Sequence, residues 1–196
     1  MLEASRGADG LFSCAAFGAR GLAATNPLFS FRILANMPPC LVSILEGVKG
    51  PNYIFNPRES QAAEALVEAW QAAADGEVDA ALAGAADCPT HPATWVYLRQ
   101  AGLLASDEFP APAGAYVVFE RAERAARDGR KILAHVESLT VRFTNAPPRD
   151  PLAARIGRTF AAAPALLVGL ACMTGEGFSA VDRDGNEFAV AVRASS

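Results

Sequence analysis

The sequence predicts an α/β fold in which at least some strand pairs are parallel. Two observations predict it. Short apolar segments of strand length are separated by longer segments of helical periodicity, and glycines or prolines mark the boundaries between them. The chain has 196 residues, of which 52% are hydrophobic and 19% charged, so we expect one sizeable core and a single domain.

The first third of the chain contains three expected elements. Gly10–Gly18 is a short apolar run between glycines, which predicts a strand buried on both faces. Leu28–Gly47 has a partly helical pattern, and Pro38-Pro39 should divide it into two pieces. A helix is expected over Pro57–Asp75, because its apolar positions recur at helical spacing and Gly76 follows as a stop signal.

The rest of the chain adds strands and a hairpin. Apolar or alternating runs predict strands within Val78–Asp87, Gly114–Glu123 and Lys131–Phe143. Proline-rich Thr144–Pro151 is then expected to be a linker, Leu152–Ala162 a helix, and the runs around Asp184-Gly185 a β-hairpin. We therefore expect one domain over residues 1–143, with residues 144–196 as a linker and C-terminal extension packed on the same domain.

Charge and cysteine content argue against several functions. The net charge is −4 and the 17 Lys and Arg residues are scattered, so nucleic-acid binding is not expected. The four cysteines lie far apart and form no C-x-x-C pair, which predicts reduced thiols, a cytoplasmic location and no metal site. The N-terminus lacks a signal-peptide segment, and the longest apolar run, Phe160–Met173, contains Pro164 and is too short to span a membrane.

Glu59 is the candidate site residue. Asn56 is a favoured N-cap, Pro57 suits the first helical position, and Glu59 completes a capping-box pattern. As a cap, Glu59→Gln should cost well under ~1 kcal/mol. Alternatively, Glu59 continues the apolar face of its helix and points inward, where the positive end of the helix dipole favours an anion. The residues favour the capping role over a functional carboxylate.

Four separated segments carry a resemblance to a known family. They are "KGPNY", the small-residue helix that follows, "GEVDAALAGAAD" and "PAGAYVVFERAERAARDGRKILAHV". In this order and spacing they resemble the N-terminal half of β-ketoacyl synthases of the thiolase fold, over Phe12 to Phe143. The resemblance implies a thiolase-like half-domain with a mixed, mostly parallel five-stranded sheet, helices packed on it, and a C-terminal strand and hairpin extension.

The resemblance also bears on function. In the family, the nucleophilic cysteine lies in the first turn of the helix after Gly50-Pro51-Asn52, and here that place holds Glu59. His91 and His135 stand in no H-G-T setting, so the family's catalytic histidines have no counterpart. The resemblance thus implies a catalytically inactive, chain-length-factor-like subunit that needs no cofactor.

Such a subunit would pair with an active ketosynthase in fatty acid, polyketide or aryl-polyene-type biosynthesis, with acyl carrier protein as a further candidate partner. Two alternatives remain open. One is a small decarboxylase-like enzyme that uses Glu59 on carrier-bound malonyl or acyl thioesters. The other is a structural domain in which Glu59 is only a cap.

Pairing and a missing strand complete the expectations. The family's strand before the nucleophile turn is an edge that pairs with its two-fold mate, and here its residues are Asn52, Tyr53, Ile54 and Phe55. A partner relieves such an edge, so we expect a dimer with itself or with a ketosynthase. The family's central strand has no counterpart, and Ala165–Met173 should either fill its place as a strand or pack on the sheet as a helix.

Overall fold

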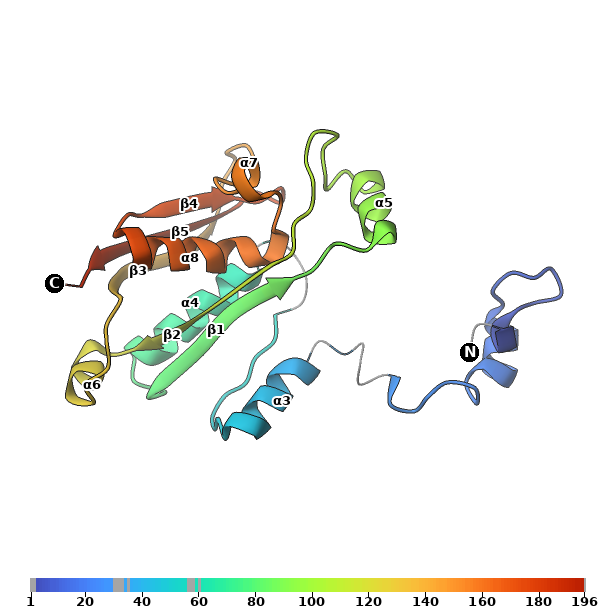
Figure 1. Cartoon of the computed structure of the whole chain (residues 1–196), viewed down its shortest axis with the longest axis horizontal. Helices are drawn as coiled ribbons and strands as arrows, with labels where there is room; N and C mark the ends of the chain where they lie inside the picture. Colours follow the sequence, from blue (N-terminus) through green and yellow to red (C-terminus); the bar gives the residue numbers. More distant parts are fainter. Residues whose placement is uncertain (1–2, 30–33, 35, 56–58, 60, 196) are drawn as a thin grey trace. The chain divides into compact units, whose positions relative to one another are not determined.

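The computed structural model describes residues 3–29, 34, 36–55, 59 and 61–195. The chain forms two compact units, Met1–Ile54 and Phe55–Ser196, and all described strands belong to the second (Figure 1). The predicted extension, residues 144–196, lies within this second unit, and the domain boundary at residue 143 stays a prediction. Among the described residues, no helix has both the length and the apolar character needed to cross a bilayer.

The first unit is built from short helical segments: η1 Glu3–Ser5, α1 Cys14–Ala16, η2 Phe17–Gly21 and α3 Met37–Glu46. The strand predicted over Gly10–Gly18 is therefore wrong. The Ser13 side chain accepts a hydrogen bond from the backbone N–H of Ala16 at 3.2 Å and caps a helical turn. This unit has no described strand to pair with the segment, and an unpaired strand would leave its backbone polar groups unsatisfied.

The expected break at Pro38-Pro39 is confirmed within one residue: residue 34 is outside any helix, residue 36 lies in a turn, and α3 begins at Met37. Both prolines lie in the first turn of α3, where the missing N–H groups cost nothing. The helix ends at Gly47, whose φ of 64° is left-handed. Residues 30–33 and 35 of this predicted segment lie outside the described residues.

The second unit holds the remaining elements: α4 Gln61–Ala74, β1 Ala80–Asp87, α5 Pro92–Gln100, β2 Ala113–Glu120, α6 Ala122–Arg127, β3 Ala134–Phe143, α7 Ala153–Ile156, η3 Phe160–Ala162, α8 Ala163–Thr174, β4 Phe178–Val181 and β5 Asn186–Ala194. The strands predicted within 78–87, 114–123 and 131–143 are confirmed as β1, β2 and β3. The helix predicted over 57–75 is confirmed from Gln61 to Ala74.

The α/β class is confirmed, but the strands form two antiparallel sheets instead of one mostly parallel sheet. β1 pairs with β2, and β3, β5 and β4 form the second sheet in that order. A parallel pair requires a connection that returns along the length of the sheet. The connection from β1 to β2 instead leaves and returns at the same end, as Figure 1 shows, so these strands run in opposite directions.

The C-terminal segments follow the sequence pattern in part. Residues 144–151 form an irregular connection, as expected of a linker. The single helix predicted over 152–162 is wrong, because Gly157 ends α7 with a φ of 85° and η3 begins after it. The hairpin around Asp184-Gly185 is confirmed by β4 and β5.

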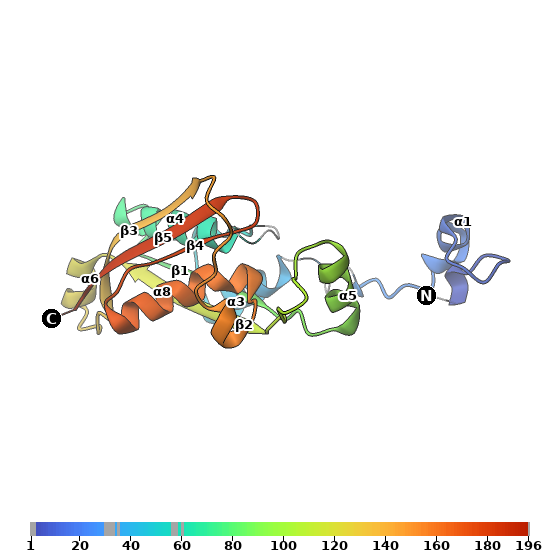
Figure 2. The same ribbon diagram turned by 90° about the horizontal axis from the view of Figure 1, so that it is seen from above.

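Two helices, α4 and α8, form a layer between the two sheets (Figures 1 and 2). α4 packs against β1 and β3, whereas α8 packs against β2 and β5. The core includes Leu66 of α4 and Leu167 and Val168 of α8, together with Phe119 of β2 and Phe188 of β5. Apolar side chains therefore cover both sides of the helical layer.

The strand proposed for Ala165–Met173 is wrong, and the alternative helix is confirmed as α8. Pro164 lies in its first turn, and Gly175 ends it with a φ of 73°. A helix pairs its backbone groups internally, so it can be apolar on every side and fill a buried middle layer. No described strand occupies the free edge of β1.

Leu167→Ala is expected to lower the free energy of unfolding by about 2–5 kcal/mol, because it opens a cavity in the buried helical layer. Urea unfolding followed by circular dichroism measures the change. Leu133→Ala is the control, since Leu133 is 64% exposed, and it should change the free energy by less than ~0.5 kcal/mol. Equal losses in the two variants would contradict this packing.

Candidate functional site

The candidate site is an ion pair between Glu59 and Arg158. Glu59 lies just before α4, and Arg158 lies between α7 and η3. Nη2 of Arg158 donates to Oε1 of Glu59 at 2.7 Å. The Arg158 side chain is 7% exposed and the Glu59 side chain 18%, so water screens the pair weakly. Asn56 and Pro57, which complete the predicted capping box, lie outside the described residues.

The backbone around Arg158 is held in place on both sides. Its N–H donates to the carbonyl oxygen of Phe109 at 2.9 Å, and its own carbonyl oxygen accepts from the N–H of Ala111 at 2.9 Å. Gly157 permits this approach, since a Cβ there would lie 2.6 Å from the Phe109 ring at a φ of 85°. The guanidinium carbon lies 5.6 Å from the ring centroid of Phe160, at cation–π distance.

Backbone strain and unpaired polar atoms gather at this point. Phe160 has a φ of 45°, a conformation that costs a non-glycine residue about 1–3 kcal/mol. Nε of Arg158 and Oγ1 of Thr159 are buried and have no hydrogen-bond partner among the described residues. The surrounding packing therefore holds this turn in a conformation that it would not adopt alone.

A small cavity with a mostly apolar lining adjoins the pair. Its described lining includes Glu59, Asp150, Arg158, Phe160 and Asp182, and its volume is about 30 Å³. This volume holds roughly two water molecules. Pockets for organic ligands are about 300–1,000 Å³, so an acyl chain does not fit in this conformation.

Neither histidine adjoins the pair in the described structure. His91 is the N-cap of α5, where Nδ1 accepts a hydrogen bond from the Ala93 N–H at 3.2 Å. His135 lies in β3, paired in register with Arg193 of β5. The described residues also contain no cluster of three His, Cys, Asp or Glu side chains suited to a metal ion. What the structure brings together is a carboxylate and a guanidinium, without an imidazole.

The segment predicted to bind a partner forms no strand in this single chain. Residues 51–55 have neither helix nor strand, because an edge strand needs a neighbour to pair with. The Asn52 side chain donates to Oγ of Ser43 at 2.9 Å, whereas Tyr53 and Phe55 are exposed and Ile54 is half-buried. Partner binding by this segment remains a prediction.

A second apolar surface lies on the outer face of β1 and β2. Leu82 is paired in register with Val118, and Tyr116 follows on the same face two residues away. All three side chains are exposed, whereas Ala83 and Phe119 on the other face are buried. Both faces of this sheet are thus apolar, which is typical of strands that are covered on both sides.

Cys172 lines a separate, open hollow of about 530 Å³ beside Leu133 and Met173. Burial raises the pKa of the Cys172 thiol above its ordinary value. The thiol is therefore less ionised than an exposed cysteine at the same pH, and a less reactive nucleophile.

Sequence patterns did not single out Arg158, the partner of Glu59. A usable signal was nevertheless present: a lone cation between Gly157 and a continuous apolar run must be paired if that run is buried. Periodicity alone could not show which carboxylate pairs with it.

Comparison with known proteins gives a family match. Residues 16–129 match the family described as the β-ketoacyl synthase N-terminal domain. A solved complex of a type II polyketide synthase acyl-carrier protein with its ketosynthase contains a chain similar over 92% of this one, with 13% identity and a TM-score of 0.75.

Two further structures are similar. The oxazolomycin ketosynthase domain of Streptomyces albus JA3453 has 17% identity and a TM-score of 0.70 over 83% of the chain. The ishigamide ketosynthase/chain length factor has 19% identity and a TM-score of 0.64 over 82% of the chain. At these identities the likeness shows a shared fold. The chain spans 70%, 50% and 62% of the three matched chains, in the order given.

Glu59→Gln should lower the free energy of unfolding by about 2 kcal/mol, because the buried Arg158 guanidinium loses the carboxylate that it contacts at 2.7 Å. This expected loss of stability is larger than the loss expected if Glu59 were only a helix cap. Arg142→Gln is the control: its pair with Glu187 is also 2.7 Å long, but Arg142 is 72% exposed, and the loss should stay below ~1 kcal/mol. Similar losses in both variants would show that burial adds nothing to the Glu59 pair.

Cys172 is expected to react with iodoacetamide more slowly than exposed Cys88 at pH 8, since its raised pKa lowers the thiolate fraction. The rate difference should narrow as the pH rises through the Cys172 pKa. Peptide mass spectrometry after timed quenching measures both rates. Equal rates at pH 8 would contradict the burial of this thiol.

Proposed function

This chain belongs to the family of β-ketoacyl synthase N-terminal domains, and from that premise we propose that it is a catalytically inactive, chain-length-factor-like subunit that pairs with an active ketosynthase. The pathway class is fatty acid, polyketide or aryl-polyene-type biosynthesis. The observation that carries the proposal is a carboxylate at residue 59, the place that the resemblance gives to the family nucleophile, held there by Arg158.

The chemistry of this position supports inactivity. Condensation requires a nucleophile that holds an acyl group as a thioester, and a carboxylate cannot hold one stably. One Glu59 oxygen is already the acceptor of a charged hydrogen bond from Arg158, so an acid or base role would first have to break that pair. His91 and His135 have other structural settings, so neither supplies a base at this position.

The size of the cavity also supports the proposal. About 30 Å³ beside Glu59 is room for water but not for a malonyl or acyl thioester. The same observation weighs against the alternative decarboxylase-like enzyme, whose substrate carboxylate would in addition be repelled by Glu59.

Exposed apolar surface supports a role in assembly. The outer face of β1 and β2 presents Leu82, Tyr116 and Val118, and the segment 52–55 presents Tyr53 and Phe55. Covering such surface with a partner is favourable by roughly 25 cal/mol per Å² of apolar area. We propose a ketosynthase as this partner or, failing that, a second copy of the chain.

The names of similar structures suggest the same class of assembly. One pairs a ketosynthase with a chain length factor, and another is a complex with an acyl-carrier protein. By analogy, we propose acyl carrier protein as a further partner of the complex. The described cysteines are all free thiols, which fits a reducing compartment such as the cytoplasm.

Co-expression with a cysteine-bearing type II ketosynthase should give a complex that co-elutes in size-exclusion chromatography with light scattering. Tyr53→Arg should weaken the complex about tenfold or more, because it places a charge in the proposed contact. Phe143→Arg is the control, since Phe143, at the end of β3, is 72% exposed and Tyr53 is 64% exposed. A strict monomer that retains no ketosynthase would refute the pairing.

The isolated chain is tested for activity in the same preparation. Neither the wild type nor Glu59→Cys should condense acyl and malonyl carrier protein, because no histidine is placed to assist. Condensation by the isolated variant would overturn the inactive-subunit proposal. Carbon dioxide release from malonyl carrier protein by the wild-type chain alone would establish the decarboxylase-like alternative.

A further inference from the structure

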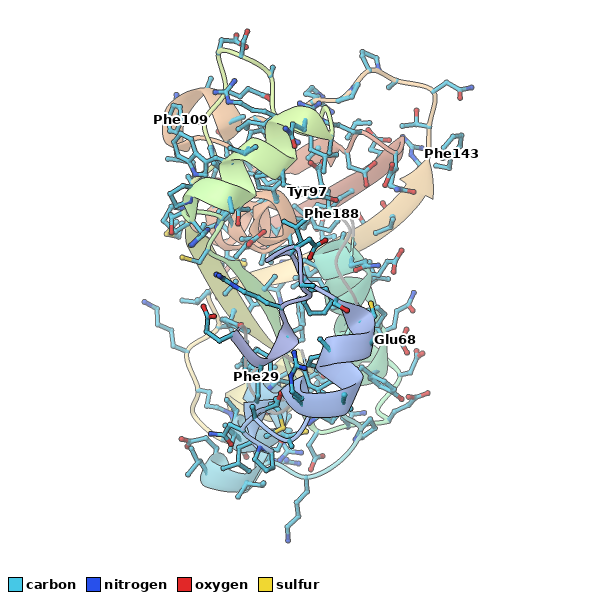
Figure 3. All side chains as sticks on the ribbon, turned by 90° about the vertical axis from the view of Figure 1, so that its right-hand side faces the viewer. Phe29, Glu68, Tyr97, Phe109, Phe143 and Phe188 are labelled. Atoms are coloured by element: carbon cyan, nitrogen blue, oxygen red, sulfur yellow. The ribbon has the colours of Figure 1, made fainter. Side chains whose placement is uncertain are left out.

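The connection between β1 and β2 forms an arm, defined here as residues 88–112, that carries α5. Figures 1 and 2 both place α5 beyond the ends of the strands, and Figure 3, viewed from that side, labels Tyr97 and Phe109 on the arm. Trp95 and Val96 of α5 are also exposed. Leu98 and Leu104 of the arm are buried, and backbone hydrogen bonds of Phe109 and Ala111 join its base to Arg158.

Glu108 organises the base of the arm. Its Oε2 accepts a hydrogen bond from the N–H of Ala105 at 2.8 Å, and its carbonyl oxygen accepts one from Nη2 of Arg99 at 3.2 Å. Arg183, in the turn between β4 and β5, pairs with the same carboxylate at 2.9 Å and also donates to the carbonyl oxygen of Gly102. The Glu108 carboxylate is thus one of the groups that join the arm to the body of the second unit, beside the backbone hydrogen bonds of Phe109 and Ala111 with Arg158.

Arg158 stands between Glu108 and Glu59. Its Nη2 contacts Glu59 at 2.7 Å, whereas its Nε lies 4.0 Å from Oε1 of Glu108. That Nε has no hydrogen-bond partner among the described residues, although the Arg158 side chain is only 7% exposed. One carboxylate is in contact with the guanidinium, and the other is just beyond hydrogen-bond distance.

We propose that Arg158 is a cation shared by two alternative carboxylates, and that Glu59 thereby acts as a positioning residue for the arm. A buried guanidinium needs a carboxylate, so removing one partner shifts it toward the other. With Glu59 neutral, Arg158 turns to Glu108 and tightens the base of the arm. With Glu108 neutral, Arg158 remains on Glu59 and the arm keeps only its other contacts.

This arrangement predicts that the two carboxylates are not independent. Each single substitution, Glu59→Gln or Glu108→Gln, leaves Arg158 one carboxylate. The double variant leaves it none, so its loss of stability should exceed the combined losses of the single variants. The inference does not depend on any partner or activity, so it can fail while the proposed function stands, and the reverse.

A double-mutant cycle in urea tests the sharing. The double variant should raise the unfolding equilibrium constant about tenfold beyond the product of the two single effects. Agreement with that product within about twofold would overturn the proposal. The control cycle combines Glu59→Gln with Arg142→Gln, which breaks an exposed ion pair on the second sheet. In this cycle, the effect of the double variant on the unfolding equilibrium constant should equal the product of the two single effects.

Hydrogen exchange tests the direction of the effect. Backbone amides of residues 99–109 should exchange about threefold or more faster in Glu108→Gln and no faster than wild type in Glu59→Gln. Faster exchange in both single variants would overturn the proposal. If Glu59→Gln does not fold by circular dichroism, Glu59→Asp takes its place in both measurements. It keeps a carboxylate but shortens its reach, so the expected coupling has the same sign and is smaller.

Discussion

A buried guanidinium must be compensated, and in this protein that requirement falls on Arg158. Leaving such a charge unpaired costs several kcal/mol, so Glu59 is held where it can reach the guanidinium. The backbone of Arg158 is bonded to the arm, and its side chain lies against Phe160 before α8. The start of α4, the base of the arm and the approach to α8 are therefore joined at one residue.

The layered core explains how the buried Arg158 guanidinium obtains a carboxylate partner. α4 and α8 lie between two sheets, and the turns that lead into both helices meet at the same end of the layer. Among the described residues there, the charged side chains of Glu59, Arg158 and Glu108 and a cavity for about two waters interrupt the apolar packing. The site is thus a structural contact at the end of the helical layer.

The packing of the core does not use residue 59. Leu66, Leu167 and Phe188 pack between the sheets independently of the chemistry at the start of α4. Function resides in the site that a fold carries and can be lost while the packing remains. In contrast, the exposed apolar face with Leu82 and Val118 is a property of the sheet itself.

The sequence by itself determined the local elements, wherever periodicity and turn residues act over a few positions. The strands β1, β2 and β3 and the hairpin at Asp184-Gly185 were predictable, because alternation and tight-turn residues are local signals. The family was also recognisable, since separated segments agree in order and spacing. Glu59 was singled out for the same reason.

Only the tertiary structure decided how these elements combine. An apolar run such as Ala165–Met173 suits a buried strand or a buried helix equally, and its place between two sheets made it helical. The antiparallel pairing of β1 with β2 depends on the path of the arm between them. The pairing of Glu59 with Arg158 joins residues far apart in the chain, and no pattern of either segment specifies it, because an ion pair forms wherever packing brings two buried charges together.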